Sequence, residues 1–357
     1  ICPKSRLRRE TVDMGSIKVM KGGLLTTIQD LGRFGHQQYG VPAAGAMDAD
    51  SLKIANLLVE NSRGEAALEI TMLGPVLEFQ ENRAFAVAGA EVPMLLNGYE
   101  VKMYKTLYGN KGDILEFGPA KSGCRTYLAI AGGFNVPPVM GSKSTYLRGN
   151  IGGFKGRKLM EGDILPAGSR ADNEGPGVRT IPQEYIPEYG DTAEIRVIIG
   201  PEADRFAAQG VETFLKSEYT LTNQCDRMGY RLKGPQVKHI AGADIISSGI
   251  SLGAIQIPQH GQPIIMMADR QTTGGYTRIA NVITVDMPAL AQLKPGGKVR
   301  FKKVDVIDAH RLIWQREERL KALEGLLCAQ SARQAESARS YRITVNGQDF
   351  SVRTTSL

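Results

Sequence analysis

Residues 66–167 consist of short β-prone runs separated by glycines and polar turns: ALEITM (67–72), VLEF (76–79), AFAVAG (84–89), DILEF (113–117), TYLAIAGGF (126–134) and DILP (163–166). Runs of this length between turn residues are typical of β-strands. A parallel βαβ domain would place a helical pattern between successive strands, and these residues contain none. The pattern therefore predicts a mainly β fold.

A similar series of runs follows a segment rich in proline. Residues 168–191 contain three prolines, which is typical of a linker or a long crossing loop. The strand pattern then resumes in EIRVIIGP (194–201), PIIMMADR (263–270), ANVITV (280–285) and KVRF (298–301). We expect a first β domain over 14–170, a linker over 171–192, a second β domain over 193–305 and a C-terminal segment over 306–357.

The two halves also resemble each other locally. GVPAAGAMD (40–48) is similar to GISLGAIQ (249–256), and an Asp-Arg cluster precedes each. The pattern Gly-x-x-Leu-x-Phe at 112–117 recurs as Gly-x-x-Val-x-Phe at 296–301. Such repeats indicate a duplicated β domain, although shared turn chemistry could also produce them.

Two helices and a terminal hairpin complete the expected elements. Asp48 precedes apolar residues at helical spacing, which predicts a helix over 48–60 with Asp48 as its cap. Heptad spacing predicts a helix over 306–336, which either packs against the body or pairs with a second copy. Asn346-Gly347 predicts a hairpin that resembles the opening of a biotinyl carrier domain. No Met-Lys-Met motif follows, so we expect no covalent biotin on this chain.

The composition argues against several functional classes. The chain is 42% hydrophobic and 23% charged, as in ordinary globular proteins, and no apolar run approaches the roughly 20 residues that span a bilayer. Its net charge of +7 comes partly from residues 1–13, which we expect to be a leader. No basic stripe with interleaved aromatic residues indicates nucleic-acid binding. Four cysteines and four histidines are scattered without ligand spacing. We expect a cytoplasmic protein without a metal site.

Two loops in the first half concentrate polar side chains that a plain β scaffold does not need. IQDLGRFGHQQY (28–39) has glycines that allow tight turns and should expose its polar residues. GSKSTY (141–146) offers amides and hydroxyls that could bind an anion, without the Walker pattern of a nucleotide loop. Either loop could instead be purely structural, as a salt-bridged turn or an ordinary turn. The candidate substrate-binding residues are Asp30, Arg33, His36, Gln37, Tyr39, Ser142, Lys143, Thr145 and Tyr146.

The third candidate combines CDRMGYRL (225–232) with ADRQTTGGY (268–276). Each contains Asp followed by Arg, and neighbouring groups of opposite charge keep each other ionised. Arg suits recognition of carboxylate or phosphate, while Asp can act as a base; a structural ion pair is the alternative. No GxSxG elbow indicates a serine hydrolase. The catalytic candidates are Asp226, Arg227, Asp269, Arg270 and Tyr276, and the substrate-binding candidates are Gln271, Thr272 and Thr273.

These loops belong to a resemblance that covers nearly all of residues 16–305. The segments that carry it include TIQDLGRFGHQQYGVPAAGAMD, YLAIAGGF, GSKSTY, DRMGYRL and DRQTTGGY. They resemble the C subunit family of ATP-dependent 5-oxoprolinase, related to the carboxyltransferase half of urea carboxylase and also called allophanate hydrolase subunit 2 or Kip-inhibitor antagonist. Cys225 stands where the family usually has Ser. The resemblance implies two tandem cyclophilin-like β-barrel domains.

The resemblance also implies an assembly. Two further subunits, a KipI-like one (B) and a LamB/YcsF-like one (A), would act with this chain to open 5-oxo-L-proline to L-glutamate with ATP hydrolysis. ATP could bind mostly on a partner. In that chemistry Arg227 and Arg270 would stabilise developing negative charge, and Asp226 or Asp269 would transfer protons. Tyr276 or Thr272 would orient the small amide substrate.

Two other functions are compatible with the same resemblance. One is a biotin-dependent carboxyltransferase subunit, which passes a carboxyl group from carboxybiotin on a separate carrier to urea or a similar amide. The other is a non-catalytic antagonist that binds a Kip-type inhibitor of a sensor kinase. The partners distinguish these alternatives.

Overall fold

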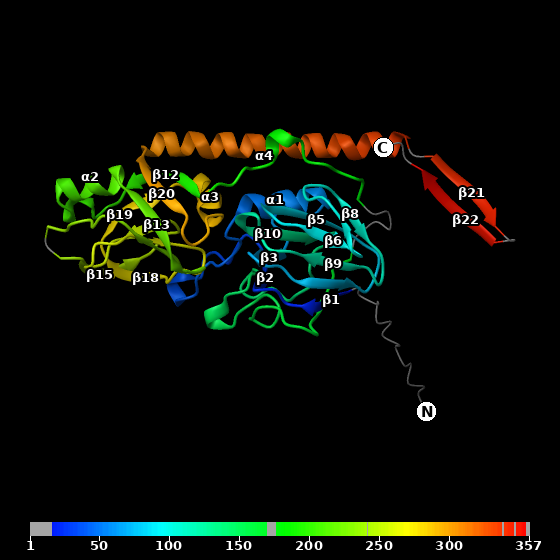
Figure 1. Ribbon diagram of the computed structural model, residues 1–357, viewed down its shortest axis with the longest axis horizontal. Helices are drawn as coiled ribbons and strands as arrows, with labels where there is room; N and C mark the ends of the chain where they lie inside the picture. The colour runs from blue at the N-terminus through cyan, green and yellow to red at the C-terminus, as the bar shows by residue number, and fades with distance from the viewer. Residues whose placement is uncertain (1–15, 170–175, 241, 338, 346–347, 355–357) are drawn as a thin grey trace, which may run out of the picture.

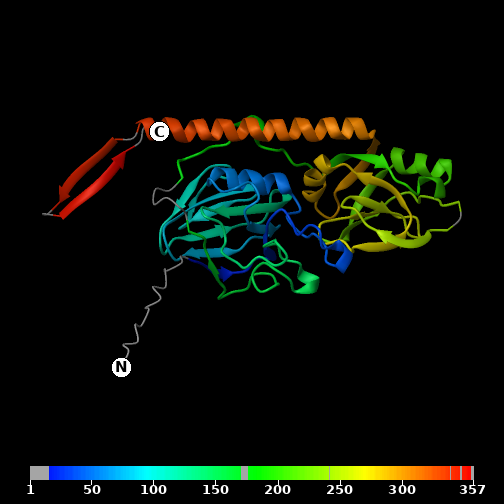
Figure 2. The same cartoon turned by 180° about the vertical axis from the view of Figure 1, so that it is seen from behind.

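The computed structural model describes residues 16–169, 176–240, 242–337, 339–345 and 348–354. It confirms the mainly β fold (Figure 1). Two β-rich halves lie side by side, and helix α4 (Val306–Ser337) runs along both (Figure 1). Figure 2 shows the same arrangement from behind. The expected leader at residues 1–13 lies outside the described residues.

The first half divides its strands between two antiparallel sheets, and each β-prone run predicted in residues 66–167 overlaps one strand. The six-stranded sheet has the order β11 (Ile164–Pro166), β1 (Ser16–Lys21), β4 (Val76–Phe79), β9 (Ile114–Phe117), β6 (Met94–Leu96), β7 (Tyr99–Glu100). The five-stranded sheet has the order β2 (Leu25–Gln29), β3 (Ala67–Thr71), β10 (Ser122–Ile130), β5 (Arg83–Glu91), β8 (Leu107–Gly109).

The five-stranded sheet is buried on both faces, and side-chain size alternates accordingly. Phe85 and Val87 of β5 point into the core between the two sheets, whereas Ala86 and Ala88 face helix α1 (Ala49–Leu58). Small residues on one face let the helix approach the sheet closely, while large residues on the other fill the sandwich. The predicted helix is confirmed, and the Asp48 side chain accepts the Ser51 amide at 3.0 Å.

The second half closes into a barrel. Its order is β12 (Thr192–Ile199), β19 (Arg278–Val282), β16 (Ala254–Gln256), β17 (Ile264–Met266), β14 (Gly229–Lys233), β13 (Glu218–Cys225), β20 (Lys298–Lys303), with β12 and β20 parallel. Helix α2 (Ala208–Lys216) places Phe214 against Phe301, with 4.4 Å between ring centroids. Outside the barrel, β15 (Asp244–Gly249) pairs with β18 (Thr273–Tyr276), and α3 (Met287–Ala291) precedes β20.

The local sequence repeat has a structural counterpart. Gly112 before β9 and Gly296 before β20 both have φ 90°, a left-handed conformation that suits glycine. The two apolar residues that follow at the same spacing are buried in each copy. These equivalent turn-strand units support duplication of a β domain.

Helix α4 ties the segment between the halves to the first half. Leu323 and Leu327 are buried in a cluster with residues of α1, which supports packing against the body. The side-chain amides of Gln330 and Gln334 each bond both backbone groups of one residue in that segment, Thr180 and Val178 respectively. The segment therefore lies along α4 as an added strand would lie along a sheet edge.

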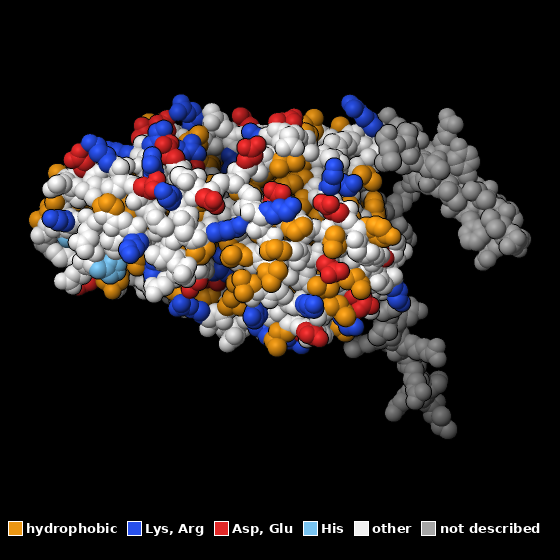
Figure 3. Space-filling view, in the orientation of Figure 1, with side chains coloured by type: hydrophobic (Ala, Val, Ile, Leu, Met, Phe, Trp, Pro, Cys, Tyr) orange, Lys and Arg blue, Asp and Glu red, His pale blue; other side chains and the backbone are white. Residues whose placement is uncertain are grey.

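The C-terminal strands and the surface complete the description. β21 (Arg339–Val345) and β22 (Gln348–Thr354) pair as the predicted hairpin, whose Asn346-Gly347 turn lies outside the described residues. On the face in Figure 3, acidic and basic side chains are interspersed. Among the residues that the structure describes, no helix is long and apolar enough to cross a membrane.

The packing of α4 predicts a difference between two adjacent leucines. Leu327→Ala should lower the free energy of unfolding by about 2–5 kcal/mol, because it leaves a cavity in a fully buried site. Leu326→Ala, at a position 45% exposed on the same helix, should change it by only about 0.5 kcal/mol. Urea denaturation followed by circular dichroism measures both, and equal losses would contradict this packing.

Candidate functional site

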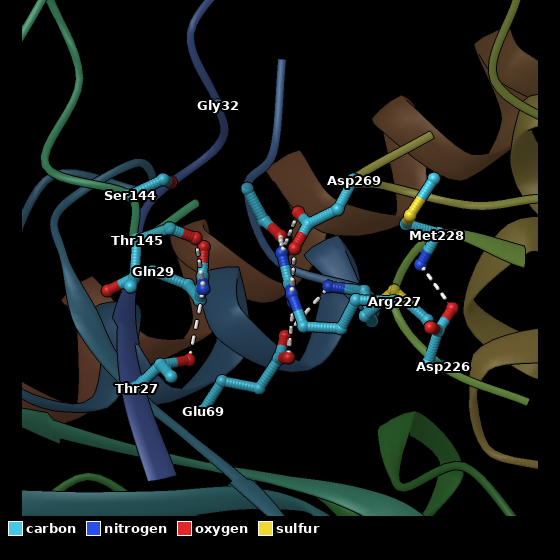
Figure 4. Close-up of polar contacts among 12 residues, drawn as sticks. Thr27, Gln29, Gly32, Glu69, Ser144, Thr145, Asp226, Arg227, Met228 and Asp269 are labelled. Carbon is cyan, nitrogen blue, oxygen red and sulfur yellow. Dashed lines mark hydrogen bonds and ion pairs between the residues drawn. The ribbon is translucent and has the colours of Figure 1, made fainter. Parts of the chain in front are cut away.

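Arg227 joins the two halves, since it follows a strand of the second half and contacts Glu69 of the first (Figure 4). It follows β13, and its side chain is 4% exposed. Its Nη1 donates to Glu69 Oε1 of β3 at 2.5 Å, and its Nη2 donates to the Gly45 carbonyl at 2.6 Å. Its Nε and Nη2 also bind the Asp269 carboxylate, at 3.0 and 2.9 Å. One guanidinium therefore joins three chain segments and two carboxylates.

Glu69 is the partner that the sequence did not reveal. It is 1% exposed, and its Oε2 accepts the Met47 amide at 2.8 Å and the Tyr127 hydroxyl at 2.7 Å. Burial alone would raise the pKa of Glu69, but Arg227 and Arg125 outweigh it, so this pKa lies below its ordinary value. Glu69 is a fixed anion. Its one sequence signal was a lone carboxylate inside the apolar run ALEIT.

Asp269 is the more basic of the two carboxylates. It follows β17 and is 3% exposed. Burial raises the pKa of Asp269, Arg227 opposes the rise, and the negative charges of Glu69 and Asp226 add to it. Since Glu69 already balances the Arg227 charge, Asp269 takes up a proton more readily. This property suits a group that transfers protons.

Arg270 is a buried cation without a carboxylate partner among the described residues. Its side chain is 6% exposed, and its Nε donates to the Ile250 carbonyl at 3.0 Å. The terminal nitrogens Nη1 and Nη2 donate to no described residue. Burial lowers the pKa of Arg270 to about 10, so it stays charged at neutral pH. A desolvated guanidinium with free donors suits recognition of an anion.

The structure pairs the two Asp-Arg sequences differently from the sequence expectation. Arg227 binds Asp269 from the other loop, not its neighbour Asp226. Asp226 is exposed, and its Oδ1 accepts the Met228 and Gly229 amides at 2.8 and 3.1 Å, which closes a turn. The turn after β13 therefore uses the Asp226 carboxylate for its own amides and leaves Arg227 to pair across the junction.

The anion held by the 141–146 loop is Asp30 of the same chain. Its carboxylate accepts the hydroxyls of Ser142, at 2.7 Å, and Ser144, at 2.5 Å, and the Lys143 amide at 2.6 Å. The Lys143 ammonium lies 2.6 Å from Glu65 Oε1. The groups expected to bind a foreign anion are therefore used internally, and the loop supports residues 28–39.

Arg33 requires a correction, because its place in a glycine-rich loop predicted an exposed side chain. It is fully buried, and it donates from Nε to the Val139 carbonyl and from Nη2 to the Ser144 carbonyl, both at 2.8 Å. Its Nη1 is buried without a partner in the described residues. Inward-facing carbonyls of the 139–144 loop draw the guanidinium under the surface.

The remaining candidates lie away from the Arg227 network or near the surface. Thr145 is buried and donates to the Ile28 carbonyl at 2.9 Å. Exposed or partly buried positions are those of His36, Gln37, Tyr39, Tyr146, Gln271, Thr272, Thr273 and Tyr276. No cluster of His, Cys, Asp or Glu in the described part of the chain could hold a metal ion.

The network predicts a large cost for removing its cation. Arg227→Met should lower the free energy of unfolding by about 3–5 kcal/mol, because it leaves buried carboxylates unbalanced. Arg148→Met, which removes an exposed ion pair with Asp226 at 3.6 Å, should cost less than about 1 kcal/mol. Urea denaturation measures both, and similar values would show that the network contributes little.

Known proteins resemble this chain along most of its length. The C subunit of 5-oxoprolinase from Escherichia coli strain K12 is 41% identical over 295 residues, 82% of this chain and 93% of that protein. Saccharomyces cerevisiae urea amidolyase is 33% identical over 327 residues, 87% of this chain but 18% of that protein. The structure of Kluyveromyces lactis urea carboxylase has a TM-score of 0.81 at 31% identity, covering 86% of this chain and 29% of that one.

A protein family that matches this chain agrees with these relatives, and the match covers the residues of the Arg227 network. The family "carboxyltransferase domain, subdomain A and B" matches residues 39–303, a range that contains Glu69, Arg227, Asp269 and Arg270. Glu69 lies on β3 of the first half, and the other three follow strands β13 and β17 of the second, so the match covers both sides of the junction. The chain therefore belongs to the carboxyltransferase subdomain A and B family, together with the 5-oxoprolinase C subunits that it resembles.

Proposed function

We propose that this chain is the C subunit of an ATP-dependent 5-oxoprolinase, which opens 5-oxo-L-proline to L-glutamate. The observation that carries the proposal is its 41% identity to the Escherichia coli C subunit over 93% of that protein. The C subunit of Haemophilus influenzae 5-oxoprolinase is 38% identical over 90% of its length. Because each match covers most of this chain and most of the relative, the matches favour the same role in an assembly.

The polar groups at the junction suit the chemistry of a lactam. Its amide is unreactive, and phosphorylation of the amide oxygen by ATP would create a leaving group before water adds to the ring carbon. Arg227 already binds Glu69, Gly45 and Asp269, so Arg270 is the better candidate to stabilise negative charge that develops in this step. Asp269, with its raised pKa, is the candidate to move a proton.

The proposal includes two partner subunits. A KipI-like partner (B) and a LamB/YcsF-like partner (A) would complete the enzyme, and ATP would bind on the assembly. Two hydroxyls and one amide of the 141–146 loop that could have held a phosphate already serve Asp30, which argues against that loop as the ATP site. This supports placing ATP mostly on a partner.

Carboxyl transfer from carboxybiotin on a separate carrier to urea or another amide is the second candidate. It is favoured by the matched carboxyltransferase family and by the similarity to urea amidolyase and urea carboxylase. The chain spans only 18% of the yeast urea amidolyase, so the activity of that larger protein does not transfer by similarity alone. A non-catalytic Kip-inhibitor antagonist would not need a buried guanidinium without a carboxylate partner, such as that of Arg270.

Reconstitution tests the proposed function directly. The chain, purified together with the A and B subunits of a bacterial 5-oxoprolinase, should release glutamate from 5-oxoproline only when ATP is present. Omitting any one of the three in turn should abolish release if all of them form the enzyme. A complete complex without product would refute the proposal, and transfer of carboxyl from carboxybiotin to urea would support the second candidate.

The raised pKa of Asp269 gives a pH test on the same complex. If ionised Asp269 is the base, kcat/KM is high above its pKa and falls as pH drops through it, at a value above the ordinary Asp pKa of about 4. Asp269→Asn and Arg270→Ala should each abolish turnover with the assembly intact by size-exclusion chromatography. Asp226→Asn, at an exposed position, is the control. Loss of assembly in the first two would indicate a structural role.

A further inference from the structure

Three neighbouring side chains in the second half have hydrogen-bonding groups that no described residue satisfies. Gln256 is 2% exposed, and its Nε2 is buried without a partner. Arg270 is 6% exposed, and only its Nε has an acceptor, the Ile250 carbonyl. Gln271, next in sequence, is exposed. Buried polar groups are almost always paired, so the Gln256 amide indicates that a water molecule or a ligand completes its bonds.

The side-chain amides of Gln256 and Gln271 converge at Gly274. A Cβ at Gly274 would lie 2.7 Å from Gln256 Nε2, 2.9 Å from Gln271 Nε2 and 3.0 Å from Ile250 Cδ1. Ile250 is also the residue whose carbonyl accepts Arg270 Nε, at 3.0 Å. The two amide nitrogens therefore converge at Gly274, and Arg270, which precedes Gln271 in the chain, is bonded to the backbone of Ile250, whose side chain also lies there.

The chemistry of this cluster is that of an anion receptor. A guanidinium and side-chain amides donate hydrogen bonds, and a carboxylate accepts as many as four. No described carboxylate pairs with Arg270, whereas Arg227 in the matching sequence position has two. Arg270 thus keeps its charge available for a ligand.

We propose that Arg270 and Gln256, with Gln271 at the entrance, form a subsite that binds the carboxylate of the substrate. This inference rests on the proposed function and adds the residues that recognise the carboxylate of its substrate. 5-Oxo-L-proline has such a group beside its lactam, and urea does not. The subsite therefore favours the lactam acid over a neutral amide.

Binding to the full chain tests the subsite without any turnover. Isothermal titration of the chain with 5-oxo-L-proline and with 2-pyrrolidinone, the same ring without the carboxylate, should show a preference for the acid. Arg270→Leu should reduce this preference about 10- to 100-fold, as expected for a lost hydrogen bond to a charged group. Gln256→Met should reduce it about 5- to 10-fold. Equal affinity for both ligands in the unsubstituted chain would overturn the inference.

Two glycines in one strand provide a matched steric test. Gly274→Ala would place a methyl group against the Gln256 and Gln271 amides and should weaken binding of the acid. Gly275→Ala meets only Ile245 O and Ser247 Oγ, each at 3.3 Å, and should leave binding unchanged. Gln256→Met should also keep or raise the melting temperature, because it removes an unpaired buried amide. A fall in melting temperature without a change in acid preference would assign Gln256 a structural role.

The reconstituted complex separates this inference from the proposed function. If the complex hydrolyses 5-oxoproline and the KM is unchanged in both Gln256→Met and Gly274→Ala, the subsite is wrong and the function stands. If the complex yields no glutamate but the chain retains an acid preference that depends on Arg270, the proposed function fails and the carboxylate subsite stands. A higher KM in both variants supports the two together.

Discussion

The Arg227 guanidinium, buried between Glu69 and Asp269, is the interaction on which the arrangement of the two halves depends. A charge removed from water is tolerated only where hydrogen-bonded partners compensate it. Here the partners come from a strand of the first half and a loop of the second, so the charge is satisfied only while the halves are joined. Gln292 also joins the two halves, with a neutral group. Its side-chain amide forms four hydrogen bonds to Cys124, Arg125 and Asp48 of the first half.

The site is defined by which donors remain after the fold has used its own. The Asp30 carboxylate accepts hydrogen bonds from two hydroxyls and one amide of the 141–146 loop. Arg33 donates its hydrogen bonds to backbone carbonyls of the same region. Arg227 is likewise committed to its two carboxylates. Arg270 differs from Arg227 because it pairs with no described carboxylate, and it has one protein acceptor, the Ile250 carbonyl, among the described residues. Polar richness in a loop is therefore a weaker guide to function than an unmet hydrogen bond in a buried side chain.

The sequence allowed the local elements to be predicted and left their pairing open. Asp48 marks the start of α1, and the short runs mark strands, because capping and periodicity act within a few residues. It also pointed to Arg227, Asp269 and Arg270 as polar residues at strand ends. It could not show that Arg227 turns from Asp226 toward Asp269, or that Glu69 joins them, since those contacts depend on how distant strands meet. The burial of Arg33 was hidden for the same reason.

Helix α4 limits the relative motion of the two halves, because it contacts both of them. It packs Leu323 and Leu327 on the first half, and Arg316 reaches the Thr284 carbonyl of the second at 3.3 Å. Its glutamines hold the connecting segment along its length. Helix α4 on the outside and the buried Arg227 ion pairs on the inside both hold the two halves in a fixed relative position. A hinge motion of the two halves would have to break the bonds of Arg227 to Glu69 and Gly45 together with the contact of α4 to the Thr284 carbonyl.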